Sequence, residues 1–147
     1  MISSAEIQMI RNANPGAVLP GIDTPTGNPV PASSLTNYTT ITQNPSGAPY
    51  YYYIPAVNEV VVTQNGAVLS GINFGSATVT IEANNVTIKD STFTATSSFW
   101  TISQAPGYSG ATVEDDTFQG SGAPTETNVW INATENITIK DLSLIHI

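Results

Sequence analysis

A nine-residue phrase occurs four times in this chain of 147 residues. The copies are GAVLSGINF, NVTIKDSTF, GATVEDDTF and NITIKDLSL, at residues 66–74, 85–93, 110–118 and 136–144. Their starts therefore lie 19, 25 and 26 residues apart. A self-similar unit with a period in the twenties is typical of a solenoid, in which each repeat buries its apolar side only by stacking on its neighbours.

Within the phrase, apolar and polar residues alternate, as Val86 and Ile88 do on either side of Thr87. A period of two predicts a strand with one buried face and disfavours a helix. A leucine-rich repeat would need a leucine ladder and an asparagine step that this unit lacks. We therefore expect an all-β fold, a parallel β-helix whose coils consist of short strands and turns.

The phrase ANNVTIKDSTF, and the coils between residues 59 and 141, resemble the right-handed parallel β-helix of the pectate lyase and pectin lyase superfamily. The opening AEIQMIRNANPGAVLPG is similar to the start of many β-helix proteins, where a short helix caps the open end of the solenoid. The resemblance implies the fold more strongly than an activity, because unrelated functions share this scaffold.

We interpret the chain as one incomplete β-helix domain. Residues 1–21 are expected to form a cap helix, with Ser3 and Glu6 as a capping box, and a strand that leads into the first coil. A frayed terminal helix is the alternative. Residues 22–58 are loop-rich first coils with a short strand at 38–42, and residues 59–141 are regular coils. The last six residues, LSLIHI, resemble a translated sequencing adapter, so we expect 142–147 to be a non-native tail and the natural chain to continue past Asp141.

Equivalent positions of stacked coils should form columns about 4.8 Å apart. The alignment predicts an inward aliphatic column of Leu69, Ile88, Val113 and Ile139, and an aromatic column of Phe74, Phe93 and Phe118. It also places Asn84, Asn85, Gly110 and Asn136 at one turn, where Asn and Gly tolerate a positive φ. We interpret these asparagines as structural.

Composition excludes several classes of partner. Only 10% of the residues are charged and the net charge is −8, so phosphate backbones and acidic polysaccharides are repelled, and we expect no nucleic-acid partner. No apolar run approaches the roughly 18 residues of a membrane span, which predicts no membrane partner. An extracellular location follows from the resemblance and the composition alone. The sequence does not indicate an oligomeric state.

Four carboxylates are the candidate metal ligands. Asp90, Asp115 and Asp141 share one column with Gly71, and Asp116 stands beside it. Repelling carboxylates can attract calcium, which takes six to eight oxygens. A position that accepts Asp or Gly is also typical of a turn, and we favour the turn, leaving weak calcium binding as the alternative and no other cofactor. The next column, Lys89, Glu114 and Lys140, is expected to hold cross-strand ion pairs.

The sequence offers no complete catalytic set. The run Glu114-Asp115-Asp116 is similar to the paired aspartates of the hydrolases in the superfamily, but their NTD, GHG and RIK motifs are absent. We expect this fragment to be inactive, while a full-length protein with further coils would be a polysaccharide lyase or glycoside hydrolase if the resemblance extends to activity.

The candidate carbohydrate site contains Trp130, Asn132 and Glu82. Alternation places Trp130 outward in a column with Thr80 and Thr101, and an indole beside amide and carboxylate groups suits a sugar ring. The alternative is that a missing loop or coil covers Trp130. Trp100 is expected to face inward. The aromatic run 50–53 should place two tyrosines on each face of a strand.

Two functions follow from these features. The leading hypothesis is a fragment of an extracellular bacterial protein that binds or processes polysaccharide. The alternative is a structural solenoid, such as the stalk of an adhesin or phage tail protein.

Overall fold

The computed structural model describes residues 27–42, 50–95, 100–120, 131–133 and 135–145, and this part of the chain is all-β. Its strands are β1 (Thr36–Asn37), β2 (Tyr51–Ile54), β3 (Glu59–Val62), β4 (Val68–Ser70), β5 (Ile72–Gly75), β6 (Thr78–Ile81), β7 (Thr87–Lys89), β8 (Thr92–Ala95), β9 (Ile102–Gln104), β10 (Ala111–Glu114), β11 (Thr117–Gly120), β12 (Ile131–Ala133), β13 (Ile137–Lys140) and β14 (Ser143–Ile145). Two single-turn 3-10 helices, η1 (Ala32–Ser34) and η2 (Tyr38–Thr40), flank β1.

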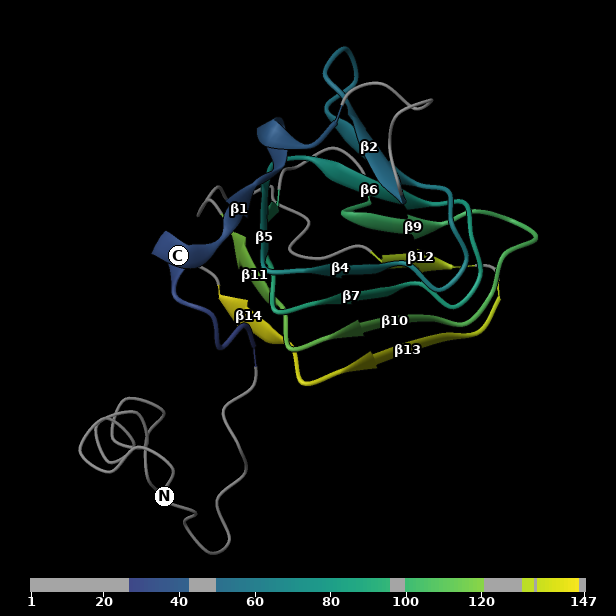
Figure 1. Cartoon of the computed structure of the whole chain (residues 1–147). Coiled ribbons are helices and arrows are strands. Elements are labelled where there is room, and N and C mark those ends of the chain that lie inside the picture. The colour runs from purple at the N-terminus through teal and green to yellow at the C-terminus, as the bar shows by residue number, and fades with distance from the viewer. Residues whose placement is uncertain (1–26, 43–49, 96–99, 121–130, 134, 146–147) are drawn as a thin grey trace, which may run out of the picture.

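The strands form three sheets. Sheet 1 has the order β1-β5-β8-β11-β14, sheet 2 the order β4-β7-β10-β13, and sheet 3 the order β2-β3-β6-β9-β12. From β3 onward the chain visits sheet 3, sheet 2 and sheet 1 in turn, four times over, and Figure 1 shows β4, β7, β10 and β13 one below another. All pairings are parallel except the one between β2 and β3. The all-β, parallel part of the sequence prediction is therefore confirmed, and the arrangement is compatible with a β-helix.

The recurring phrase supplies the strands of sheets 2 and 1 in every repeat. Ile88 is aligned with Leu69 on one neighbouring strand and with Val113 on the other, and Val113 is aligned with Ile139. Leu69, Ile88 and Val113 are fully buried. The predicted aliphatic column is thus present in the predicted register, but Ile139 is 48% exposed, so only the first three members face a closed interior.

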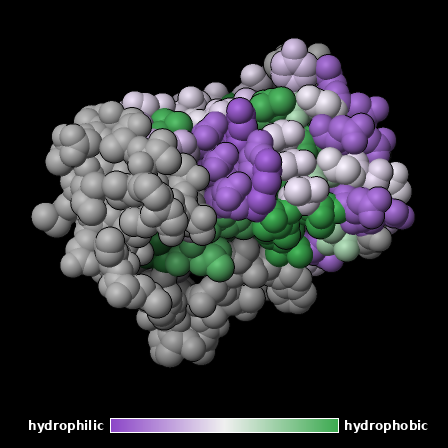
Figure 2. Space-filling model, turned by 90° about the horizontal axis from the view of Figure 1, so that it is seen from below, coloured by the Kyte–Doolittle hydropathy of each residue, from purple (hydrophilic) through white to green (hydrophobic). Residues whose placement is uncertain are grey.

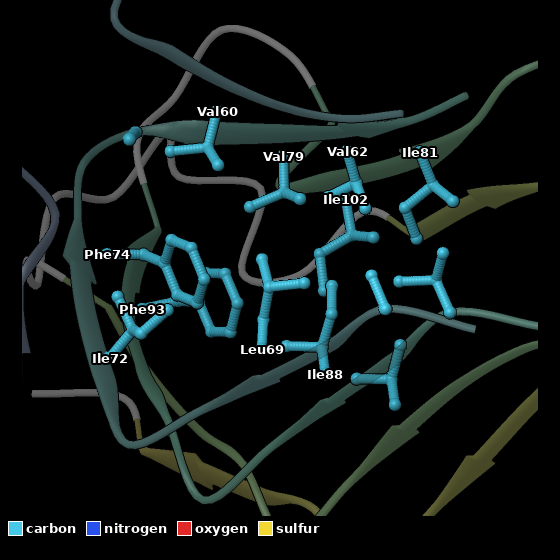
Figure 3. Close-up of a cluster of buried hydrophobic side chains, with 14 of the residues drawn as sticks. Val60, Val62, Leu69, Ile72, Phe74, Val79, Ile81, Ile88, Phe93 and Ile102 are labelled. Atoms are coloured by element: carbon cyan, nitrogen blue, oxygen red, sulfur yellow. The ribbon is translucent and has the colours of Figure 1, made fainter. Parts of the chain in front are cut away.

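The aromatic column is also confirmed. The rings of Phe74 and Phe93 stack with centroids 4.6 Å apart and planes 9° from parallel, and those of Phe93 and Phe118 stack at 4.7 Å and 6°. Figure 3 shows the Phe74 and Phe93 rings face to face beside Leu69. Offset stacking of buried rings adds roughly 0.5–1.5 kcal/mol per pair to the burial of their area.

Sheet 3 closes the interior from the other side. Val60, Val79 and Ile102 occupy successive strands in register and are fully buried. In Figure 3 these side chains point toward Leu69 and Ile88 of sheet 2. The inner faces of the three sheets therefore share one apolar core.

The turn that precedes the strands of sheet 2 contains an asparagine ladder. Asn85 and Gly110 have φ values of 56° and 78°. The backbone N–H of Asn84 donates to Oδ1 of Asn65 at 2.8 Å, and the N–H of Ser109 donates to Oδ1 of Asn84 at 2.9 Å. The asparagines thus bond from one repeat to the next, which agrees with a structural role.

The short strand predicted at residues 38–42 is wrong. The chain forms η2 there, because Oδ1 of Asn37 accepts the N–H of Thr39 at 2.9 Å and the carbonyl of Asn37 accepts the hydroxyl of Thr40 at 2.7 Å. Such local bonds compete with a strand ladder. Tyr38 packs its ring edge-on against Tyr53, with centroids 5.1 Å apart.

Other expectations fall partly outside the described residues. The predicted cap helix at residues 1–21 lies there entirely. In the segment expected to be a non-native tail, Ser143 to Ile145 form β14 and pair with β11, and the origin of that segment stays a prediction. Within the described residues, no helix is both long enough and apolar enough to span a membrane.

Candidate functional site

The acidic column lies at the turn between sheet 2 and sheet 1. Asp90, Asp115 and Asp141 have φ values of 52°, 54° and 53°, and Gly71 of the first repeat has 68°. Asp tolerates this left-handed conformation better than most residues, and Gly adopts it without strain. The positive φ at all four positions explains why this column contains only Asp and Gly. A metal site would not require that backbone conformation, so the observation favours the turn interpretation.

The carboxylates of this column interact electrostatically. Partial burial, followed by the charges of Asp141 and Asp90, raises the pKa of Asp115. Oδ2 of Asp90 accepts the hydroxyl of Ser70 at 3.1 Å. Across the described ranges, no group of three or more His, Cys, Asp or Glu side chains is arranged to hold a metal ion. The described residues therefore contain no preformed metal site. Calcium binding at Asp90, Asp115, Asp116 and Asp141 stays a prediction.

The neighbouring charged column forms one of its two expected ion pairs. Nζ of Lys140 lies 2.6 Å from the carboxylate of Glu114, and this hydrogen bond raises the pKa of Lys140. Lys89 is aligned with Glu114, but its ammonium lies 3.9 Å from the carboxylate of Asp90. The side chains of both lysines are substantially exposed, so each pair contributes at most about 1 kcal/mol.

Asp116 is not a fourth surface carboxylate beside the column, because its side chain lies in the interior. The residue is fully buried, and the N–H of Ser91 donates to its Oδ1 at 2.8 Å. Oδ2 has no hydrogen-bond partner among the described residues. Burial raises the pKa of Asp116 to about 8, although the bond from Ser91 opposes the rise. The group is therefore mostly a neutral acid at pH 7.

The sequence contained a signal for this burial. Asp116 occupies the position of Ile72, Ser91 and Leu142 in the other copies of the phrase, and Ile72 and Ser91 are both buried. The pairing of Asp116 with Asp115 as a hydrolase-like motif obscured that position. Asp116 is fully buried and the neighbouring Asp115 is only half-buried, so the two carboxyls lie in different environments.

The described residues contain only part of the predicted sugar site. Trp130 lies outside them. Asn132 is aligned with Ser103, which is aligned with Thr80, so Asn132 occupies the column predicted for Trp130 and Thr101. Glu82 follows β6, and β9 separates that strand from β12. The expected column was therefore shifted by two residues.

Trp100 also differs from the sequence expectation. Its exposed fraction is 36%, whereas an inward position was predicted. The strand β9 begins at Ile102, so Trp100 precedes the alternating segment from which its direction was inferred.

A pocket that the sequence did not indicate lies beside β1 and β2. It has a volume of about 210 Å³ and is lined by Thr36, Thr40, Ile41, Thr42 and Tyr51. The carbonyl of Thr42 accepts the N–H of Tyr53 at 2.9 Å, which joins the segment after η2 to β2. Burial raises the pKa of the Tyr51 phenol. A tyrosine hydroxyl is protonated at neutral pH even without this shift and can donate a hydrogen bond.

The pocket is lined by one tyrosine, three threonines and one isoleucine, and by no charged residue. Aromatic faces stack on the apolar faces of sugar rings, and hydroxyl groups can both donate to and accept from sugar hydroxyls. The volume is below the range of about 300–1,000 Å³ that is usual for drug-sized ligands, which limits the pocket to one small group.

Comparisons of the chain with protein families, with curated proteins and with solved structures found no match.

Proposed function

We propose that this chain is part of an extracellular protein with the right-handed parallel β-helix fold of the pectate lyase and pectin lyase superfamily, and that it binds neutral polysaccharide. The cyclic order of the three sheets, parallel from β3 onward, supports the fold assignment. The resemblance of the repeated phrase supports the superfamily. Enzyme activity, whether lyase or hydrolase, belongs to the proposal only for a longer protein with further coils.

The observation that carries the binding proposal is the uncharged pocket of Tyr51 and the three threonines. A neutral lining suits a neutral sugar, because burying a charge without a partner is costly. The net charge of −8 also opposes a polyanion such as polygalacturonate at low ionic strength. A pocket for one sugar unit buries little area, so the affinity for an isolated oligosaccharide should be weak.

Calorimetry or NMR titration with a panel of neutral oligosaccharides tests the proposal. We expect dissociation constants in the millimolar range, about −4 kcal/mol, for at least one sugar in the panel. Tyr51→Ala should abolish the signal by removing the ring that lines the pocket. Tyr50→Ala is the matched control, because Tyr50 is the adjacent tyrosine, is 46% exposed and does not line the pocket.

Two results would contradict binding at this pocket. The first is the absence of binding by any neutral sugar at millimolar concentration. The second is equal loss of binding in the Tyr50 and Tyr51 variants, which would place the ligand elsewhere or indicate a general effect on β2.

A structural stalk is the second candidate function, and the repetitive core favours it. The aromatic and aliphatic columns extend through successive repeats without a break for a site. Failure of every glycan in the titration would favour this alternative.

A further inference from the structure

The first turn of the asparagine ladder contains a reactive pair of residues. Asn65 is followed directly by Gly66, and the sequence has no other Asn-Gly pair. A backbone nitrogen can attack the carboxamide carbon of the residue before it, and glycine hinders this attack least because it has no Cβ. Both residues are exposed between β3 and β4, and no described atom beyond the chain neighbours lies within 4 Å of the position that a Cβ of Gly66 would take. Solvent therefore reaches the reacting atoms.

In the folded turn, one residue of the next repeat engages both reacting groups. The N–H of Gly66 donates to the carbonyl of Asn84 at 2.8 Å, and Oδ1 of Asn65 accepts the N–H of Asn84, also at 2.8 Å. Ring closure would require the Gly66 nitrogen to leave that carbonyl, lose its proton and approach Cγ of Asn65. The paired turn is therefore unreactive, and the reaction needs an opened turn.

The first turn has a neighbouring repeat on one side. Among the described residues, β4 is a terminal strand of sheet 2, and Figure 1 shows it at the end of that sheet opposite β13. Figure 2 views the other end of the stack from below and shows apolar surface beside hydrophilic surface, where further coils would stack. Asn84 is bonded on both sides, to Asn65 and to Ser109. Exposed terminal segments open at a lower free energy than the interior of a fold, so we expect the first turn to open before the later ones.

We propose that Asn65 deamidates spontaneously when this turn opens, and that the isoaspartyl product holds the turn open. In the open turn a base removes the proton of the Gly66 N–H, and the nitrogen forms a bond to Cγ of Asn65. The bond between Cγ and Nδ2 then breaks, and Nδ2 leaves as ammonia with a proton returned by the solvent. The product is a cyclic imide that joins the two residues, and the step is neither an oxidation nor a reduction.

Hydrolysis of the imide gives two products that the fold distinguishes. Addition of water at Cγ restores the main chain and gives aspartate, whose Oδ1 can accept the N–H of Asn84 as before. Addition of water at the main-chain carbonyl carbon gives isoaspartate, in which the backbone runs through the side chain and is longer by a methylene group. The fixed reach of the chain then places the Gly66 N–H out of register with the carbonyl of Asn84. Isoaspartate therefore makes the opening irreversible.

Peptide mapping by mass spectrometry tests the proposal on the full chain kept in mildly alkaline buffer. We expect Asn65 to deamidate about 10- to 100-fold more slowly in the folded chain than in the chain unfolded by denaturant, because two hydrogen bonds must break first. The protection of the Gly66 N–H against hydrogen exchange should be of the same size, since the same opening exposes it. The control variant is Asn65→Gln, which keeps a carboxamide but would have to close a less favourable ring, and it should stay unmodified.

A second variant distinguishes local opening of the turn from unfolding of the whole chain. Phe93→Ala weakens the core at sheet 1, away from the turn between β3 and β4, so it should leave the deamidation rate of Asn65 unchanged. If this variant does not fold, low concentrations of denaturant replace it. The wild-type rate should then hardly respond to denaturant, because local opening exposes little surface.

Four outcomes contradict the proposal. Equal rates in the folded and unfolded chains would show that the bonds to Asn84 do not protect Asn65. A rate that rises with global destabilisation would assign the reaction to the unfolded chain. No modification of the folded chain would show that the turn stays closed. An isoaspartyl form whose Gly66 N–H is still protected from exchange would show that the longer backbone does not hold the turn open.

Discussion

At the scale of the residue, Asp116 is a titratable group enclosed in the interior. Its carboxyl group is fully buried, one oxygen accepts the N–H of Ser91, and the other has no partner among the described residues. A buried carboxylate in apolar surroundings is costly unless it is protonated, which explains the direction of its pKa shift. The folded chain therefore holds a proton that the unfolded chain releases.

This proton makes stability depend on pH. The pKa of Asp116 rises from an ordinary value near 4 to about 8, so its contribution to stability is complete below pH 4 and is lost as the pH rises toward and through 8. Between the two values the slope can approach about 1.4 kcal/mol per pH unit for one proton. We expect the denaturant concentration at the unfolding midpoint of the wild type to decrease as the pH is raised from 5 to 9. The midpoint of Asp116→Asn should decrease much less over the same range. Parallel curves for the two proteins would show that Asp116 is ionised in the folded state.

At the scale of the element, the strands are held by columns of identical or similar side chains that cross from repeat to repeat. Phe93 is the middle member of the aromatic column and contacts a ring on each side. The outward neighbour Thr94 is exposed on the same strand. Substitutions at these two positions can therefore distinguish the contribution of core packing in β8 from the contribution of its intrinsic strand propensity.

Replacement of the middle ring tests this packing. Phe93→Ala should lower the free energy of unfolding by about 3–5 kcal/mol, because it leaves a cavity between two rings that cannot collapse onto each other. Thr94→Ala should change it by less than about 0.5 kcal/mol, as exposed positions usually do. Chemical denaturation of both variants gives the comparison. A loss below about 1 kcal/mol for Phe93→Ala would mean that the ring column is not enclosed.

At the scale of the whole molecule, the recurring phrase predicted the strands of two of the three sheets and their register, except between β5 and β8, where the pairing shifts and Gly75 rather than Phe74 is aligned with Phe93. Each copy is nine residues long, so the turn inside it has a constant length and the columns follow directly. The connections from sheet 1 to sheet 3 vary: residues 76–77, 96–101 and 121–130 separate the successive strands. Alternation cannot fix a register across connections of unequal length, which is why Thr101 was aligned with Thr80 in place of Ser103.

The candidate sites were less predictable for two physical reasons. The pocket brings Thr36 and Thr42 against Tyr51 through the antiparallel pairing of β2, which has no counterpart in the repeat. The acidic column could be identified in the sequence, but its spacing is compatible both with a structural turn and with a cation-binding site. The positive φ values at Asp90 and Asp115 favour the turn.

The stacking of successive repeats is the central claim, and inter-ring nuclear Overhauser effects measure it most directly. The protein would be labelled at its four phenylalanines, with Phe99→Leu used to identify the signals of Phe99. Centroid separations of 4.6 Å and 4.7 Å predict detectable effects between Phe74 and Phe93 and between Phe93 and Phe118, and none between Phe74 and Phe118. Absence of the two predicted effects, or a direct effect between Phe74 and Phe118, would contradict the stacked arrangement.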